Sequence, residues 1–131
     1  MKPKIKVNEI MNCNPKVIHR DETVAAAARN LASNDIGFLP VAEGDRLIGV
    51  VTDRDLVVRV MATGKDPSQV CVGEILTDKP KYCFDDEDIG HVQRNMDELH
   101  VRRLPVVNRD KRLVGIVSRH DIRQSRTARA K

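Results

Sequence analysis

Aromatic side chains are scarce in this sequence. Its 131 residues include two Phe, one Tyr and no Trp, so aromatic residues make up 2% of the chain. The interior must therefore be filled by Val, Ile, Leu, Ala and Met. Proteins that bind single-stranded nucleic acid stack its bases on aromatic rings, and this chain offers few of them.

Long apolar runs are also missing. No stretch approaches the roughly 18 apolar residues that a membrane-spanning helix needs, and residues 1–7 lack the hydrophobic segment of a signal peptide. Hydrophobic residues make up 40% of the chain and charged residues 32%, a composition typical of globular proteins. We therefore expect a cytoplasmic protein with no membrane partner.

Cysteines are few and widely spaced. The three, Cys13, Cys71 and Cys83, are odd in number and form no CxxC pair. This pattern argues against a disulfide framework and against a zinc knuckle. We expect three buried, reduced thiols.

Motifs of catalysis are not recognisable. The four histidines are scattered, no HExxH or His/Cys cluster occurs, and the glycines form neither GxGxxG nor GxxxxGK[ST]. The sequence therefore predicts no enzymatic activity, no metal site and no obligatory cofactor.

The net charge of +4 is concentrated at one end of the chain. Four basic residues and no acid lie in residues 123–131, which leaves 19 basic and 19 acidic residues elsewhere. Such a basic tail can contact phosphates of a nucleic acid. A frayed, solvated terminus is the alternative, and it is the one we favour.

What the chain does contain is an internal repeat. The sequence LIGVVTDRD at residues 47–55 returns as LVGIVSRHD at residues 113–121. Further matching stretches extend the repeat to about 65 residues: 7–11 with 72–76, 16–31 with 81–96, and 39–41 with 104–106. Because a half of this length buries little surface alone, we expect the two copies to share a core.

Each copy predicts the same order of elements, β-α-β-β-α. Residues 16–18 form a short extended run, and the acids and hydroxyl of residues 21–23 favour a helix start. The buried stripe of this first helix is predicted to be Val24, Ala27, Ala28 and Leu31, and that of its counterpart Ile89, Val92, Met96 and Leu99.

A hairpin and a second helix complete each copy. Residues 38–41 and 47–51 read as strands around a short turn, and residues 53–61 return to helical spacing. The buried positions predicted for the second helices are Leu56, Val57, Val60 and, in the second copy, Ile122. The fold class is thus α/β, with the two copies packed sheet to sheet around a pseudo-twofold axis.

The repeat also sets the domain boundaries that we expect. They are 7–61 for the first repeat, 62–71 for a linker rich in turn formers, 72–125 for the second repeat, and 126–131 for the basic C-terminal tail.

Both copies carry a glycine in the middle of a predicted strand. Gly49 and Gly115 occupy positions where glycine weakens a strand, and close approach of a ligand or of another backbone is a reason to keep it. Three residues later, Thr52 or Ser118 lies at a strand-to-helix junction, where free N–H groups favour an anion. The alternative is that each hydroxyl only caps its helix.

A repeat of this length with Leu-Pro-Val and Gly-x-x-[Ser/Thr]-x-x-Asp resembles the cystathionine-β-synthase (CBS) domain. The resemblance covers residues 7–61 and 72–125, which form the tandem pair called a Bateman module. In layout the chain is similar to small stand-alone bacterial CBS-pair proteins of the hypoxic-response type.

The resemblance implies an adenine nucleotide, AMP, ADP or ATP, in a cleft between the two repeats. Asp55 and Asp121, one helical turn beyond their hydroxyls, would accept the ribose hydroxyls. Arg102 and Arg103 would hold phosphate, whereas the first copy has Gly37 and Phe38 there. The complete set of candidate ligand-binding residues is Thr52, Asp55, Ser118, Asp121, Arg102, Arg103, Tyr82, Val17, Phe38 and His120.

Two of these candidates, Tyr82 and His120, also have a structural explanation. Val17 and Tyr82 match in the two copies, and Tyr82 either stacks on adenine or fills the core. His120 either approaches a phosphate or is a surface residue at a helix start.

A regulatory module that senses an adenine nucleotide is the function that we favour. A ligand-free dimeric scaffold for a protein partner and a nucleic-acid-binding protein acting through its tail are the alternatives. The resemblance also implies a homodimer, with Val57, Val60, Ile122 and parts of the Val24 and Ile89 stripes packed against a second copy.

Overall fold

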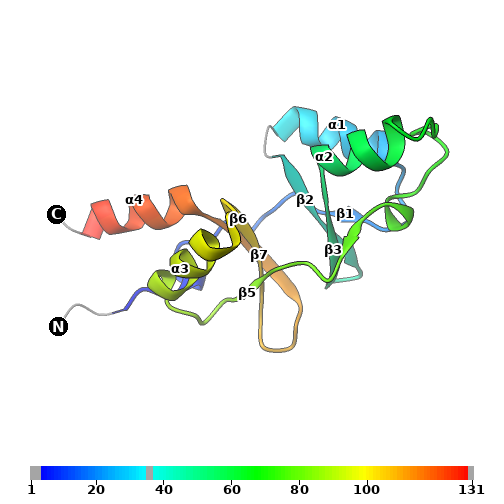
Figure 1. Cartoon of the computed structure of the whole chain (residues 1–131). Helices are drawn as coiled ribbons and strands as arrows, with labels where there is room; N and C mark the ends of the chain where they lie inside the picture. Colours follow the sequence, from blue (N-terminus) through cyan, green and yellow to red (C-terminus); the bar gives the residue numbers. More distant parts are fainter. Residues whose placement is uncertain (1–3, 35–36, 130–131) are drawn as a thin grey trace. The chain divides into compact units, whose positions relative to one another are not determined.

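The computed structural model describes residues 4–34 and 37–129 of the chain (Figure 1). They form two compact units. The first-repeat unit comprises residues 16–80, and the second-repeat unit joins the N-terminal segment up to Pro15 to the chain from Lys81 onward. The predicted boundaries assigned residues 7–15 to the first repeat, whereas the structure groups them with the second-repeat elements. The predicted linker, residues 62–71, belongs to the first-repeat unit.

The first-repeat unit holds a four-stranded sheet in the order β1-β2-β3-β4. β1 runs parallel to β2, and the other neighbours are antiparallel. Its elements are β1 (Ile18–His19), α1 (Val24–Asn34), β2 (Phe38–Glu43), β3 (Arg46–Thr52), α2 (Asp53–Leu56), the π-helical turn η2 (Val57–Met61), the 3₁₀ turn η3 (Val72–Glu74) and β4 (Thr77–Asp78).

The second-repeat unit holds a three-stranded sheet in the order β5-β6-β7, with the same parallel and antiparallel pairings. Its elements are the 3₁₀ turn η1 (Val7–Glu9), β5 (Cys83–Phe84), α3 (Ile89–Leu99), β6 (Arg103–Val107), β7 (Leu113–Ser118) and α4 (Arg119–Arg129). The predicted α/β class and the order β-α-β-β-α in each copy are confirmed. The predicted tail continues α4 as far as Arg129.

Local hydrogen bonds explain where the first helix of each copy begins. The Thr23 hydroxyl accepts a hydrogen bond from the Ala26 N–H at 3.1 Å, and the Asp88 carboxylate accepts one from the Gly90 N–H at 3.2 Å. Side-chain oxygens at these positions satisfy N–H groups that have no partner within the helix.

The described residues form two clusters of buried side chains, one in each unit, where the sequence favoured one shared core. Each cluster nevertheless contains residues that lie at, or just before, the predicted start of the other repeat. Val70, Val72 and Ile75 are buried with the first-repeat elements, and Val7 is buried with the second-repeat elements. The core of each unit is thus completed by the segment that begins the other repeat.

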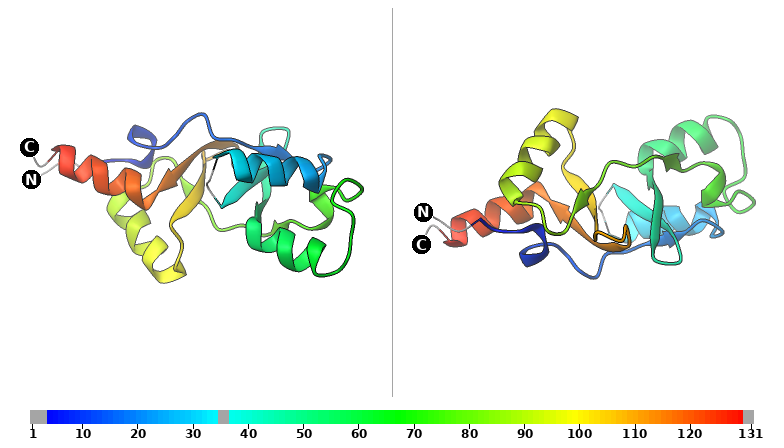
Figure 2. Two further views of the ribbon diagram at one scale, coloured as in Figure 1. Left: turned by 90° about the horizontal axis from the view of Figure 1, so that it is seen from above. Right: turned by 90° about the horizontal axis from the view of Figure 1, so that it is seen from below.

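Backbone hydrogen bonds hold these two segments in equivalent ways. The Val7 N–H donates to the Glu87 carbonyl at 2.9 Å, and the Val72 N–H donates to the Glu22 carbonyl at 2.8 Å. The two donors are 65 residues apart in the sequence, and so are the two acceptors. Figure 2 shows η1 beside the elements of the second repeat in both views. A second equivalent pair joins Ile89 N–H to Ile5 O at 2.9 Å and Val24 N–H to Val70 O at 2.8 Å.

The two mid-strand glycines are explained by these segments. A Cβ atom on Gly49 would lie 2.6 Å from the Thr77 carbonyl oxygen, and one on Gly115 would lie 2.7 Å from the Asn12 carbonyl oxygen. Of the two reasons that the sequence left open, close approach of another backbone is therefore the one observed.

We predict that Gly115→Ala lowers the free energy of unfolding by about 1–3 kcal/mol, because the new methyl group overlaps a backbone oxygen that cannot rotate away. Gly90→Ala is the matched control. In α3 the nearest atoms to its Cβ are the ends of charged side chains, with Arg126 Nη2 at 3.2 Å, and alanine favours the helix. Urea denaturation measures both variants, and equal losses would contradict the steric explanation.

Three side chains predicted to be buried are exposed. Ala28 is exposed at the edge of the α1 stripe, whose core positions are Val24, Ala27 and Leu31. Leu99 is 39% exposed because α3 ends there, before His100 adopts a left-handed conformation. Val57 is 55% exposed, since Leu56 and Val60 already fill the inward face of α2 and η2.

Candidate functional site

The hydroxyl and acid of each Gly-x-x-[Ser/Thr]-x-x-Asp motif pair with each other at a helix start. The Asp55 N–H donates to the Thr52 hydroxyl oxygen, and the Thr52 N–H donates to the Asp55 carboxylate, both at 3.0 Å. Ser118 and Asp121 make the same reciprocal pair at 3.0 and 3.1 Å. Both motifs therefore cap their helices, as the structural alternative predicted.

Asp55 has further partners in β4 and η2. The Thr77 hydroxyl lies 3.2 Å from both carboxylate oxygens of Asp55, and Arg59 Nε lies 3.8 Å from Oδ1. With 8% exposure, Asp55 is the one buried charged residue of the described chain. Its carboxylate is already engaged by the protein on both oxygens.

Asp121 has no such partners. Asn12 and Ser125 occupy the positions equivalent to Thr77 and Arg59, and their side chains bond elsewhere, to the Asn14 N–H and the Ile122 carbonyl. Within the described residues, Oδ2 of Asp121 accepts from the Ser118 N–H and Oδ1 has no hydrogen-bond partner. Asp121 thus retains an acceptor oxygen for a ligand.

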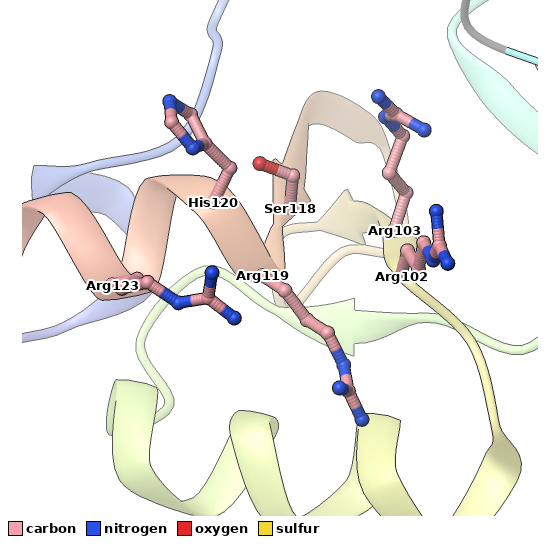
Figure 3. Close-up of a pocket in the computed structure, with 6 residues that line it drawn as sticks. All are labelled: Arg102, Arg103, Ser118, Arg119, His120 and Arg123. Atoms are coloured by element: carbon pink, nitrogen blue, oxygen red, sulfur yellow. The ribbon is translucent and has the colours of Figure 1, made fainter.

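A cavity of about 430 Å³ lies beside this motif in the second-repeat unit (Figure 3). It is within the size range of pockets that bind small molecules. Its lining residues come from the ends of β6 and β7, the residue before β6, and the first turns of α4: Arg102, Arg103, Ser118, Arg119, His120 and Arg123.

The cavity unites four of the predicted site residues and adds two that the sequence analysis missed. Arg103 lies directly opposite Ser118 in the β6–β7 pairing, which brings a cation beside the hydroxyl. Arg119 and Arg123 were not predicted, although they come one and five residues after Ser118 and share one face of α4 through their i, i+4 spacing. A comparison of the residues on the C-terminal side of each hydroxyl in the two copies would have found them.

Arg119 is held at both its backbone and its side chain. Its N–H donates to the Arg102 carbonyl at 2.9 Å, and its guanidinium Nη2 donates to the Asp97 carboxylate on α3. Figure 3 shows the side chain extending from α4 toward α3. Its Nε is buried and has no hydrogen-bond partner among residues 4–34 and 37–129.

The equivalent corner of the first repeat lacks this charge. Phe38 lies opposite Thr52 in the strand pairing, where the second repeat has Arg103 opposite Ser118. The positions that match Arg119 and Arg123 are Asp53 and Val57. Thr52, Asp55, Phe38 and Val17 belong to the first-repeat unit and are not among the residues that line the cavity.

Tyr82 is 40% exposed and does not belong to the core. Its ring meets Phe84 edge to face, with centroids 5.6 Å apart, and the Arg109 guanidinium lies 4.1 Å from the Phe84 centroid. Arg109 also donates to Asp86, and this hydrogen bond lowers the pKa of the Asp86 carboxyl. Tyr82 is therefore available for stacking, and its contact with a base stays a prediction.

The expectation of three buried thiols is wrong for two of them. Cys13 is exposed, because it follows the segment that pairs with β7, and Cys71 is half-buried, with its Sγ 3.6 Å from the Asp21 carbonyl oxygen. Cys83 is buried in β5. Burial, together with the charges of Glu87 and Asp85, raises the pKa of the Cys83 thiol to about 12.

We predict that a disulfide reagent such as DTNB modifies Cys13 rapidly and Cys83 only after unfolding. At pH 8 a thiol with a pKa of about 12 is ionised in about one molecule in 10,000, and the thiolate is the reactive form. Thiol counting in buffer and in guanidinium chloride measures this difference. Cys13→Ser should remove the fast phase, and rapid modification of Cys83 in the native Cys13→Ser protein would contradict the burial.

Two negative observations apply to the described residues. None of their helices combines the length and apolar character needed to cross a membrane. No group of three or more His, Cys, Asp or Glu side chains among them is arranged to hold a metal ion.

The comparison with known families also finds two copies of one domain in this chain. The profile of the CBS domain matches residues 7–62 and 72–127. The chain belongs to the CBS-domain family. It is 40% identical over 115 residues to "Hypoxic response protein 1" of Mycobacterium tuberculosis (strain ATCC 25618 / H37Rv), covering 87% of this chain and 80% of that protein.

Solved structures of CBS-domain proteins have the same fold. Hypoxic Response Protein I, solved with two coordinated zinc ions, has a TM-score of 0.82 at 37% identity over 92% of this chain and 98% of its own. The CBS domain pair of MJ0100, in complex with 5′-methylthioadenosine and S-adenosyl-L-methionine, has a TM-score of 0.78 at 28% identity, covering 97% and 99%. CBSX2 in complex with AMP has a TM-score of 0.82 at 26% identity, covering 96% and 98%.

Proposed function

We propose that this CBS-domain protein is a non-enzymatic regulatory module that binds an adenine nucleotide, AMP, ADP or ATP, at the second-repeat corner. The observation that carries the proposal is the cavity lined by Ser118 and four arginines at the start of α4. Adenosine-containing ligands in the MJ0100 and CBSX2 structures support the choice of ligand class.

Each part of the nucleotide has a suitable group in this corner. The Ser118 hydroxyl accepts from the Asp121 N–H, so its own proton is available to a phosphate oxygen. Arg103 and Arg102 add charge-assisted donors, and His120 lies at the rim as a further donor. Oδ1 of Asp121, which has no partner in the part of the chain that the structure describes, can accept a ribose hydroxyl. Tyr82 lies outside the cavity lining in the same unit, and its exposed ring is proposed to stack on the base.

A thermal-shift screen with adenosine, AMP, ADP, ATP, NAD and S-adenosylmethionine tests the proposal. A ligand at 100 times its Kd stabilises the folded protein by about 2.7 kcal/mol, which gives a clear rise in Tm. GTP is the control for the base. The absence of a saturable shift with every adenosine compound would overturn the proposed function and favour the ligand-free scaffold.

We also propose that the protein is a homodimer, through a face that keeps only Val57 from the predicted set. Val60, Ile122, Val24 and Ile89 are buried in the cores of their own units and are unavailable to a partner. Three large apolar side chains on η2 are exposed instead: Val57 at 55%, Val58 at 51% and Met61 at 72%.

We predict that light scattering of the protein gives about twice the chain mass of 14.7 kDa and that the double variant Val58→Glu/Met61→Glu is monomeric at micromolar concentration. Two carboxylates in an apolar interface would lose hydration without gaining partners. Leu99→Glu, on the exposed end of α3, is the matched control and should stay dimeric. A monomeric wild-type protein would remove the dimer.

A further inference from the structure

Arg119 connects three elements beside the second-repeat cavity. It is the first residue of α4, and its N–H donates to the carbonyl of Arg102, the residue before β6, at 2.9 Å. Its guanidinium donates to the carboxylate of Asp97, near the C-terminal end of α3. Figure 3 shows this side chain extending toward α3 and not toward the Ser118 hydroxyl, where a phosphate is proposed to lie. Asp97 therefore fixes the orientation of a residue that lines the cavity.

The contact between Asp97 and Arg119 is weak enough for a ligand to displace. The Asp97 side chain is 56% exposed and the Arg119 side chain 36% exposed, and an exposed ion pair favours the paired state by a factor of about 5 at most. The pair also leaves the buried Arg119 Nε without an acceptor among residues 4–34 and 37–129. A charge-assisted hydrogen bond to phosphate is worth a factor of about 10 to 150. A phosphate oxygen therefore competes successfully with the Asp97 carboxylate.

The first repeat has neither member of this pair. The match between the two copies places Ala32 at the position of Asp97 and Asp53 at the position of Arg119. Alanine carries no charge, so the equivalent ion pair cannot form there. The pair thus belongs only to the corner that is proposed to bind the nucleotide.

We infer that Asp97 sets the phosphate affinity of this corner, because it competes with the phosphate of the ligand for Arg119. Asp97 is not among the residues that line the cavity, so it acts through Arg119 as a positioning residue. The inference rests on the proposed function and adds a residue that determines its specificity. Adenosine has no phosphate and leaves the contact between Asp97 and Arg119 in place, so Asp97 reduces the preference of the site for AMP over adenosine.

Isothermal titration calorimetry of the full chain with AMP and with adenosine tests the inference. Asp97→Asn should tighten AMP binding by about 2- to 5-fold, the worth of the lost ion pair, and should change the adenosine affinity by less than about 1.5-fold. Arg119→Gln should weaken AMP binding by at least about 2-fold, because a charge-assisted contact with phosphate is lost. Adding Asp97→Asn to Arg119→Gln should change the AMP affinity by less than about 1.5-fold, because no guanidinium remains to compete for.

Two control variants separate this contact from a general change of charge. Glu98→Gln removes an acid from the next position of α3, which is also exposed, and should keep the wild-type preference for AMP over adenosine. Asp97→Glu retains a carboxylate and should keep the AMP affinity closer to that of the wild-type protein than Asp97→Asn does. Circular dichroism and the Tm without ligand verify that each variant is folded.

The outcomes distinguish this inference from the function on which it rests. An unchanged preference in folded Asp97→Asn, the same gain in Glu98→Gln, or a gain that persists without Arg119 would overturn the role of Asp97 and leave nucleotide binding intact. Weaker AMP binding in Asp97→Asn would also overturn it, because Asp97 would then present Arg119 to the phosphate. Failure of adenosine, AMP, ADP and ATP to bind the wild-type protein would overturn both the inference and the proposed function.

Discussion

Replacing Asp121 by alanine is expected to weaken binding of the adenine nucleotide by about 10- to 150-fold, the loss of a charge-assisted hydrogen bond. Replacing Asp55 is expected to change affinity by less than about 3-fold. The two acids occupy the same place in their motifs, but Thr77 and Arg59 already engage Asp55, whereas Asp121 keeps one oxygen without a partner in the described chain.

Arg103→Ala should weaken binding to a similar extent as Asp121→Ala, because it removes the guanidinium opposite Ser118. Phe38→Ala changes the matching position in the first repeat and is the control. Calorimetry at a temperature well below the Tm of every variant measures all four proteins. A high-affinity site that survives in Asp121→Ala and is lost in Asp55→Ala would place the nucleotide at the first repeat instead.

The local structure could be predicted because both copies carry the same short sequence patterns at their helix starts. The acids and hydroxyl of residues 21–23 predicted a helix start, and Thr23 caps that helix in the structure. The reciprocal pairing of Ser118 with Asp121 also agrees with their spacing. Such contacts join residues three apart, whose relative positions are fixed once the helix forms.

Contacts across long sequence separations could not be predicted in the same way. The repeat places glycines at positions 49 and 115, but nothing within each motif identifies the Thr77 or Asn12 carbonyl as the neighbouring atom. The exchange of segments between repeats decides these contacts. The same exchange explains why Asp55 and Asp121 have different hydrogen-bond partners. The residue placed beside Asp55 is Thr77, which bonds to it, and the equivalent residue in the second-repeat unit is Asn12, which does not bond to Asp121.

Only two of the four arginines that line the second-repeat cavity were predicted from the sequence. Arg102 and Arg103 were predicted because they precede Leu-Pro-Val, which matches in the two copies. Arg119 and Arg123 lie beyond Ser118, in a helix that carries many charged residues. Only the folded chain shows that both residues line the same cavity, while Arg126, three residues beyond Arg123 on α4, is not part of its lining.

The contact between Asp55 and Thr77 gives the second large expected effect, on stability. We predict that Asp55→Ala lowers the free energy of unfolding by about 2–3 kcal/mol, because it removes a charged acceptor and leaves the Thr77 hydroxyl without its partner. Thr77→Val should cost about 1–1.5 kcal/mol, since it removes one hydrogen bond and keeps the side-chain shape. Urea denaturation at 25 °C, followed by circular dichroism, measures both losses.

A double-mutant cycle tests whether the two residues act through each other. If Asp55 stabilises the fold by fixing Thr77 to the start of α2, Asp55→Ala/Thr77→Val should cost at least about 0.5 kcal/mol less than the sum of the single losses. Asp121→Ala is the control and should cost only about 1 kcal/mol, the value of a helix cap, because Asn12 does not bond to it. Additive losses at Asp55 and Thr77, or an equal loss at Asp121, would show that β4 is held beside α2 without this contact.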